Sequence, residues 1–144
     1  QITTFDKLEE YLQKVKDTKP GVTPFLTSKD KTFTTLGAGY NVYQGFYQED
    51  GTVKYYADSQ EWHDFLARMH SWYEKGYLMK DFASMTQSEA QAMFDVGQLA
   101  CIGDSVDATY SRVADKFTVT NLPYMRKEAD SVIGSHLPNW PGSL

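Results

Sequence analysis

Apolar and polar residues follow one another in a pattern that predicts helices separated by short buried strands. The stretch TTFDKLEEYLQKVKDTKPG, residues 3–21, has the 3.6-residue period of a helix that packs on one face. Thr3 or Thr4 is placed to cap this helix, and Pro20-Gly21 is expected to end it. The stretch VTPFLTS that follows is typical of a short buried strand. The expected core stripe of the helix is Phe5, Leu8, Tyr11, Leu12 and Val15.

The period is less clear in the next part of the chain. Glycines interrupt residues 32–47, for which we expect a helix that loosens toward Gly45. The stretch YQEDGTVKYYA predicts a hairpin, because Asp50-Gly51 readily adopts the positive φ angles of a tight turn. Asp58 is expected to cap the following helix, with Glu61 completing a capping box.

Residues 62–82, WHDFLARMHSWYEKGYLMKDF, contain the long amphipathic helix that this cap introduces. On a helical wheel Trp72 flanks the apolar stripe, and Asp64 and Arg68 on the opposite face are spaced for an ion pair. His63 and His70 are seven residues apart, which separates their backbones by about 10 Å. That spacing is too long for one zinc ion, so surface histidines are favoured over metal ligands. The expected core stripe is Trp62, Phe65, Leu66, Met69 and Tyr73.

The second half of the chain repeats the alternation of helix and strand. TQSEAQAMFDVG predicts a short helix with Thr86 and Glu89 as a capping box and Gly97 as its end. LACI predicts a buried strand, after which a turn leads to a helix over 106–114. KFTVTNLP is typical of a strand that ends at Pro123, and SVIGSHLPNWPGSL contains a possible last strand. This alternation predicts an α/β fold.

Length and charge narrow the picture further. A chain of 144 residues is expected to form one domain, residues 1–144. The net charge of −5, without a basic stripe, argues against nucleic acid as a partner. No apolar run approaches the roughly 20 residues of a membrane-spanning helix. The single cysteine, Cys101, lies in an apolar stretch that favours inert burial over reactivity.

No pattern for catalysis, a metal or a cofactor stands out. G-x-S-x-G, the phosphate-binding P-loop and G-x-G-x-x-G are all absent from the sequence. Asp104 and Asp107, or Glu49 and Asp50, are spaced as paired carboxylates, but adjacent acids in a turn more often face solvent. We therefore expect no catalytic residue, no metal and no cofactor.

The order of several short motifs resembles a known family. The stretches are TTFDKLEEYLQKVK, YYADSQEW, WYEKGYLMKDF, AQAMFDVGQLACIGDS and FTVTNLPYMRKEADSVIG, which together span residues 3–135. In this order they resemble the extracellular solute-binding proteins of ABC importers. The similarity is to the family 1, sugar-binding type of maltose receptors and Gram-positive lipoproteins. The resemblance implies the second lobe of a two-lobed, hinge-closing receptor of the periplasmic-binding-protein type, with the first lobe of the same chain missing.

The resemblance also implies a function. Such receptors capture a sugar or oligosaccharide between two lobes, close around it, and deliver it to the membrane permease subunits of the importer. They are not enzymes. They are found outside the cell as lipoproteins anchored to the membrane, or in the periplasm. A single lobe supplies one wall of the cleft, so weak or undetectable binding is expected from these residues alone.

Two loops carry the ligand-binding residues that the resemblance implies. In the loop after PFLTS, Lys31 and Phe33 match a polar residue and an aromatic that stacks on the sugar. Phe33 is equally well interpreted as the first core residue of the next helix. In the loop after LACI, Asp104 and Ser105 begin a helix whose free N–H groups can meet hydroxyls or an anion.

Other aromatic positions are open to two interpretations. Maltose-type relatives have a tryptophan near the position of Asp107, and its absence here leaves sugar stacking at that point in doubt. Tyr110, one turn further on, either replaces it or belongs to the core. Further aromatic candidates for the cleft wall are Tyr40, Tyr43 and Trp140.

Two other classes of protein compete with the receptor. The ten tyrosines and three tryptophans also suit a protein- or glycan-interaction module without hinge motion. A glycosidase fragment that uses Asp104 and Asp107 is the third alternative.

Overall fold

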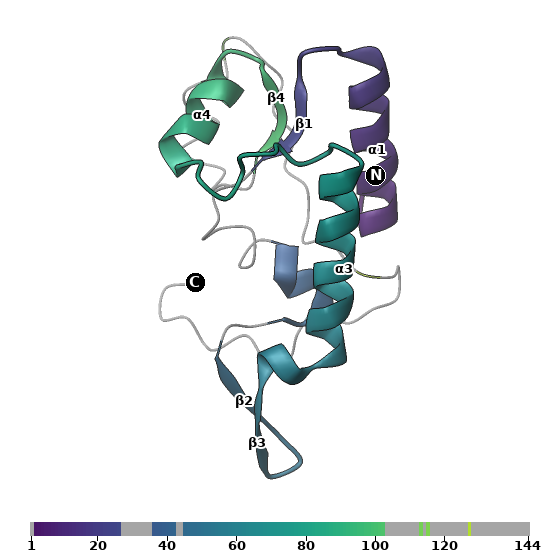
Figure 1. Ribbon diagram of the computed structural model, residues 1–144, viewed down its shortest axis with the longest axis vertical. Coiled ribbons are helices and arrows are strands. Elements are labelled where there is room, and N and C mark those ends of the chain that lie inside the picture. The colour runs from purple at the N-terminus through teal and green to yellow at the C-terminus, as the bar shows by residue number, and fades with distance from the viewer. Residues whose placement is uncertain are drawn as a thin grey trace.

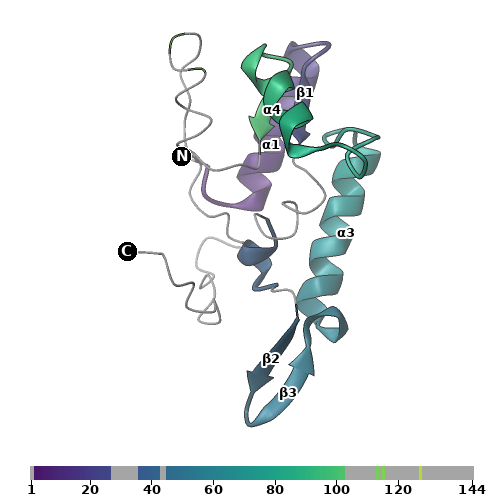
Figure 2. The same cartoon turned by 90° about the vertical axis from the view of Figure 1, so that its left-hand side faces the viewer.

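The computed structural model describes residues 2–26, 36–42 and 45–102, together with Val113, Asp115 and Lys127. The described part is elongated, with a small parallel sheet near one end and a hairpin at the other (Figure 1). Figure 2 shows the same arrangement from the side, with the long helix α3 between the two ends. The elements are α1 (Phe5–Thr18), β1 (Thr23–Leu26), the 3₁₀ helix η1 (Gly37–Tyr40), β2 (Phe46–Glu49), β3 (Thr52–Tyr55), the 3₁₀ helix η2 (Tyr56–Asp58), α3 (Gln60–Glu74), α4 (Gln87–Asp95) and β4 (Leu99–Ile102).

Strands β1 and β4 are parallel neighbours, as an α/β fold requires. Phe25 is the partner of Cys101, and Leu26 that of Ile102. On the other side of β1, Phe25 forms a parallel bridge with Leu78, the second residue after the turn that follows α3. Parallel strands need a crossover, and here α4 carries the chain from Leu78 to the start of β4. The predicted α/β class is confirmed.

Helix α1 forms where the apolar period predicts it. Thr4 is the N-cap, and its hydroxyl accepts a hydrogen bond from the backbone N–H of Lys7 at 3.4 Å. Tyr11, which we placed in the core stripe, is exposed, because the face that meets the sheet and α3 is narrower than the stripe. The buried residues are Phe5, Leu8, Leu12 and Val15.

The long helix α3 buries a different face from the one that the wheel predicted. Leu66 and Tyr73, both assigned to the core, are 38% and 40% exposed. Trp72, assigned to the flank, is completely buried, and its ring centroid lies 6.1 Å from that of Phe5 and 5.9 Å from that of Phe25. Helix α3 is rotated about its own axis so that Trp72 fits between α1 and β1. The buried face of the helix is therefore shifted toward Trp72. The buried residues of the helix are Phe65, Met69 and Trp72.

The N-cap of α3 is Ser59, not Asp58 as predicted. The Ser59 hydroxyl accepts from the backbone N–H of Trp62 at 3.2 Å and donates to the carbonyl of Tyr56 at 2.7 Å. The chain makes one 3₁₀ turn, η2, before the helix starts, and that turn includes Asp58. The capping position therefore moves by one residue.

The predicted hairpin turn and the predicted capping box of α4 are confirmed. Asp50 and Gly51 have φ angles of 51° and 78°, and they connect the antiparallel strands β2 and β3. Thr86 and Glu89 form both hydrogen bonds of the capping box of α4. Of the helix expected over 32–47, the described residues show a helical Leu36 followed by η1, and strand β2 already begins at Phe46. Of the helix expected over 106–114 only Val113 is described, in helical conformation, and the strands predicted after it lie outside the described residues.

The ion pair predicted within α3 is replaced by pairs with other parts of the chain. Arg68 Nη1 donates to Asp6 Oδ1 at 2.7 Å and to Glu9 Oε2 at 3.2 Å, both on α1. Asp64 pairs instead with Lys127. Arg68 thus joins α3 to α1. A contact between two helices cannot be predicted from the spacing of residues within one of them.

Glu9 is the centre of this contact between the two helices. Its carboxylate accepts hydrogen bonds from the indole Nε1 of Trp72 at 3.1 Å, from Arg68 and from Lys75. Burial opposes ionisation of Glu9, but the hydrogen bonds from Lys75 and Trp72 and the charges of Lys75 and Arg68 outweigh it and lower its pKa. The carboxylate is therefore held ionised beside the buried indole.

Replacement of Glu9 by alanine removes the acceptor of a fully buried indole N–H. We expect Glu9→Ala to lower the free energy of unfolding by about 1–3 kcal/mol at neutral pH, measured by urea denaturation. The matched control is Glu10→Ala, an exposed carboxylate on the same helix, which is expected to change it by less than about 0.5 kcal/mol. Equal effects of the two substitutions would contradict the role assigned to Glu9.

The pKa of Glu9 is tested by comparing the wild type with Glu9→Ala at different pH values. Because its folded-state pKa lies below the ordinary value of 4.5, its stabilising contribution is complete above that pH and is lost as the pH falls through the folded-state pKa. The difference in stability between the wild type and Glu9→Ala should therefore shrink in acid. A difference that stays constant from neutral pH to well below 4.5 would argue against this charge effect.

Candidate functional site

The carboxyl ends of the parallel segments meet at one edge of the sheet. Leu26 and Ile102, the last residues of β1 and β4, are direct partners. The parallel bridge between Phe25 and Leu78 brings a third segment to the same edge. The chain therefore leaves three neighbouring segments side by side, at the edge where open α/β sheets bind their ligands. We call this edge the strand-end edge.

The two predicted ligand-binding loops continue from this edge. The residues themselves, with two of the three further aromatics, lie outside the described residues, so their roles stay predictions. These are Lys31, Phe33, Asp104, Ser105, Asp107 and Tyr110, with Tyr43 and Trp140. What the structure provides is the pairing of Leu26 with Ile102, which places the starting points of both loops next to each other.

Tyr40 is described, and it does not face a cleft. Only 3% of its surface is exposed. Its ring lies 4.9 Å from that of Phe5 and 5.7 Å from that of Phe65, measured between centroids. Tyr40 is the last residue of η1, and its ring fills the core between α1 and α3. The suggestion that Tyr40 lines the ligand cleft is therefore wrong.

The third segment at the strand-end edge, residues 79–86, escaped the sequence analysis. Met79 and Phe82 pack against a small core cluster that includes Leu26 and Leu99. At the start of α4, both polar atoms of the Gln87 side-chain amide are buried without a hydrogen-bond partner. A buried amide without partners is costly, and it offers one donor group and one acceptor to any ligand that reaches it. No sequence signal distinguishes Gln87 from other glutamines.

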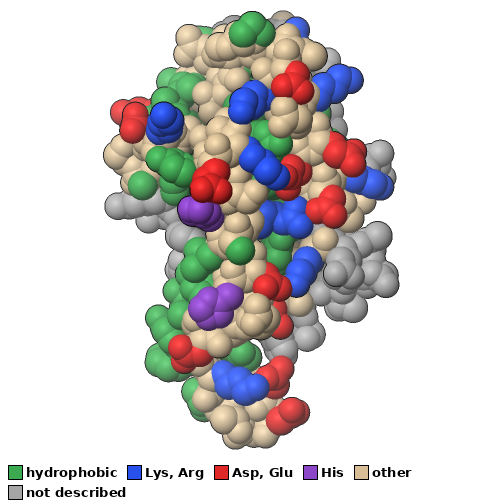
Figure 3. Space-filling model, turned by 45° about the vertical axis from the view of Figure 1, so that its right-hand side comes forward, with side chains coloured by type: hydrophobic (Ala, Val, Ile, Leu, Met, Phe, Trp, Pro, Cys, Tyr) green, Lys and Arg blue, Asp and Glu red, His purple; other side chains and the backbone are tan. Residues whose placement is uncertain are grey.

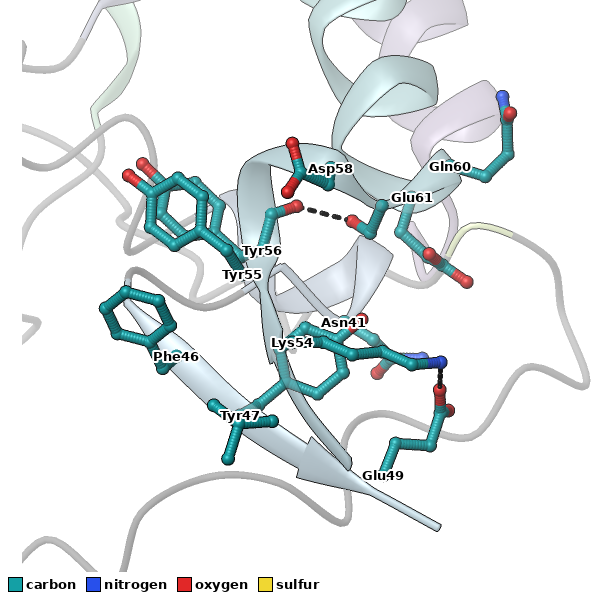
Figure 4. Close-up of a pocket in the computed structure, with 12 residues that line it drawn as sticks. Asn41, Phe46, Tyr47, Glu49, Lys54, Tyr55, Tyr56, Asp58, Gln60 and Glu61 are labelled. Atoms are coloured by element: carbon teal, nitrogen blue, oxygen red, sulfur yellow. Dashed lines mark hydrogen bonds and ion pairs between the residues drawn. The ribbon is translucent and has the colours of Figure 1, made fainter. Parts of the chain in front are cut away.

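A separate hollow lies at the far end of the molecule, between the hairpin and the start of α3. Its volume is about 750 Å³. Figure 4 shows aromatic side chains from β2, β3 and η2 around it. The ring centroids of Phe46 and Tyr55 are 5.1 Å apart, and those of Tyr55 and Tyr56 are 4.9 Å apart. We call this hollow the hairpin pocket.

The charged residues of the hairpin pocket are mostly acidic. Lys54 pairs with Glu49 across the hairpin, and this hydrogen bond raises the pKa of Lys54. Asp58 and Glu61 line the pocket near the start of α3. Two carboxylates thus remain on a pocket whose cation is already paired.

The histidines lie apart on the surface. Figure 3 shows histidine side chains separated from each other among charges of both signs. His63 and His70 are both exposed. The Nδ1 atom of His70 lies 3.7 Å from Oε2 of Glu74. Among the described residues, no group of three or more His, Cys, Asp and Glu side chains is arranged to hold a metal ion. None of the described helices is long and apolar enough to span a membrane.

Cys101 lies in β4 and packs against the core. Burial raises the pKa of its thiol to about 12. At neutral pH the thiol is therefore protonated and a poor nucleophile, in agreement with the predicted inert role.

Comparison with known proteins supports the fold. No protein-family model matches the chain, and no curated protein matches it either. Among solved structures, the chain is similar to the crystal structure of the alginate-binding protein AlgQ2 without calcium ion. The match has 21% sequence identity and a TM-score of 0.58, and it covers 69% of this chain and 22% of the other. The fold is that of a fragment of a periplasmic-binding-protein-type structure.

The pKa of Cys101 predicts slow alkylation. At pH 8 the thiolate fraction of a thiol with a pKa near 12 is on the order of 1000-fold below that of an unperturbed cysteine. We expect iodoacetamide to label the native chain at a rate lower by about that factor than the rate in guanidinium chloride, measured by mass spectrometry. Labelling of the native chain at the unfolded rate would show that the thiol is exposed and ionisable.

Proposed function

We propose that the chain forms one wall of the saccharide-binding cleft of an extracellular solute-binding protein. The observation that carries this proposal is the pairing of Leu26 with Ile102. It brings the starting points of both predicted ligand-binding loops together at the strand-end edge, where the fold binds ligands. The similarity to an alginate-binding protein supports a saccharide as the ligand class.

The wall would act by offering planar polar groups and an aromatic face to the sugar. Lys31 and Phe33 are proposed for the first loop, and Asp104 with Ser105 for the second. To these we add Gln87, the first residue of α4, because its buried and unpartnered amide can hydrogen-bond to two hydroxyls. No bond is made or broken in this role, so the proposed protein is not an enzyme.

The other wall would come from the first lobe of the receptor. The chain spans 22% of the alginate-binding protein that it resembles, so the full receptor is part of the proposal. Ligand that touches both walls favours the closed form, since only the closed form provides both sets of contacts. We propose that the closed receptor then delivers its ligand to the permease of an ABC importer. The proposed location is the cell surface, as a lipoprotein, or the periplasm.

A lone wall should bind saccharide weakly. A good small-molecule site buries 70–90% of its ligand, and one wall leaves much of the ligand in water. We expect no binding of alginate oligosaccharides or malto-oligosaccharides to the 144-residue chain by calorimetry. The full-length gene product is expected to bind one member of such a panel and to become more compact in small-angle scattering. Micromolar binding by the 144 residues alone would contradict the one-wall account.

Gln87 is expected to lower the stability of the chain and to strengthen saccharide binding. Because its amide is buried without partners, Gln87→Leu should raise the free energy of unfolding of the chain by about 1 kcal/mol. In the full-length protein the same substitution should weaken binding of the saccharide about tenfold, as for the loss of a hydrogen bond to a ligand. The control is Gln98→Leu, an exposed glutamine before β4 at the opposite edge. If Gln87→Leu raises stability but leaves affinity unchanged, Gln87 does not contact the ligand.

A further inference from the structure

Three of the five methionines lie around one small apolar cluster, at the end of the molecule that carries the parallel sheet. Figure 1 shows α4 beside β4 and β1 at this end. The methionines come from the segment between α3 and α4 and from α4 itself. We call Met79, Met85 and Met93 the methionine cluster. The buried residues on which they pack come from β1, α4 and β4, and they are Leu26, Ala90 and Leu99.

The methionine cluster differs from the methionine of the larger core. Met69 is 8% exposed and belongs to the core cluster that also contains Trp72 and Phe65. The three residues of the methionine cluster are each partly exposed. The fifth methionine, Met125, lies outside the described residues. A reagent in solution therefore has easier access to the methionine cluster than to Met69.

The contacts of these methionines hold α4 on the parallel sheet. Among the described residues, only three members of the small apolar cluster are buried, and its other members are partly exposed. Helix α4 has nine residues, and so short a helix needs packing to be stable. The buried and unpartnered amide of Gln87 lowers its stability further. The position of α4 therefore depends strongly on the methionine side chains.

Oxidation turns a methionine from an apolar into a polar side chain. Hydrogen peroxide transfers one oxygen atom to the thioether sulfur, its O–O bond breaks, and water is released. The sulfur loses two electrons in this step, and the peroxide gains them. The resulting sulfoxide is costly to bury among apolar neighbours. Methionine sulfoxide reductases reverse the reaction, so the change is reversible.

We propose that the methionine cluster is a reversible oxidation site, and that its reaction with hydrogen peroxide releases α4 from the parallel sheet. The part of the chain from Met79 to Ile102 loosens, because the cluster joins the segments of this part. The larger core stays folded, since its described methionine, Met69, is buried. The strand-end edge changes with α4, because the segment 79–86 belongs to that edge and carries two of the three methionines.

The first experiment identifies the methionines that react. The native chain is treated with hydrogen peroxide, and the oxidation of each methionine is followed by peptide mass spectrometry. We expect Met79, Met85 and Met93 to react at least about tenfold faster than Met69 in the native chain, and at the same rate as Met69 in guanidinium chloride. Equal native rates for Met69 and the methionine cluster would overturn the proposal.

The second experiment locates the structural response by hydrogen exchange. In the oxidised chain, peptides from residues 79–102 should exchange at least about tenfold faster than before, and peptides from α1 should be unchanged. Methionine sulfoxide reductases A and B together reduce both sulfoxide epimers and should restore the original exchange. Unchanged exchange of residues 79–102 after oxidation would contradict the proposal, and this result requires no variant to fold.

Matched variants assign the response to the three sulfur atoms. Leucine is similar to methionine in volume, so the triple variant Met79→Leu, Met85→Leu and Met93→Leu should stay folded and lose the response to peroxide. Circular dichroism establishes that it is folded. The control Met69→Leu should keep the response. A response that persists in the folded triple variant would assign the oxidation to another residue, first of all Cys101 in β4, and would overturn the proposal.

One consequence rests on the proposed function. In the full-length protein, peroxide should weaken saccharide binding about tenfold, because the oxidised strand-end edge no longer holds its shape, and the reductases should restore the affinity. If hydrogen exchange responds as expected and the affinity stays the same, the methionine cluster is supported and the saccharide wall at this edge is contradicted. If hydrogen exchange does not respond, the proposal for the methionine cluster fails and the saccharide wall is unaffected.

Discussion

The hydrogen bond from the buried indole of Trp72 to Glu9 is the interaction on which the rest of the structure depends. It links α3 to α1 at 3.1 Å, while the ring of Trp72 contacts Phe5 from α1 and Phe25 from β1. A fully buried indole needs a partner for its N–H, and the ionised Glu9 provides a strong one. This contact sets the rotation of α3, and α3 in turn places Leu78 beside Phe25 and the hairpin at the far end.

A row of contacting aromatic rings extends from Trp72 to the hairpin. From Trp72 the contacts pass through Phe5, Tyr40 and Phe65 in the core. They then continue through Trp62, Tyr56 and Tyr55 to the exposed Phe46. Aromatic side chains bury large areas with few rotatable bonds, so such a row is a rigid support. The row of rings thus connects the two ends of the molecule, and yet the ends offer different chemistry.

Local signals in the sequence predicted the local structure well. The caps at Thr4 and Thr86 and the turn at Asp50-Gly51 each depend on a few adjacent residues, so their patterns are sufficient. The wheel of α3 failed because the sequence tells which residues are apolar, not which neighbour they meet. Trp72 is buried and Leu66 is not, since α1 and β1 lie on the side of Trp72.

The candidate site shows the same division. The resemblance implied that the loops after PFLTS and LACI carry the ligand-binding residues, and the pairing of Leu26 with Ile102 places the starting points of these loops side by side. The unpartnered amide of Gln87 and the aromatic row of the hairpin pocket depend on contacts between distant segments, so no short motif announces them. Both features are recognised only from the burial and the contacts of side chains in the folded structure.

The central claim, that the strand-end edge is a saccharide-binding wall, is tested most directly by hydrogen exchange of the full-length protein with and without a saturating oligosaccharide. The account predicts slower exchange in the peptides that follow Leu26 and Ile102 and in the segment 79–86, and no change in the hairpin of residues 46–55. Protection of the hairpin with no change at the strand-end edge would contradict it.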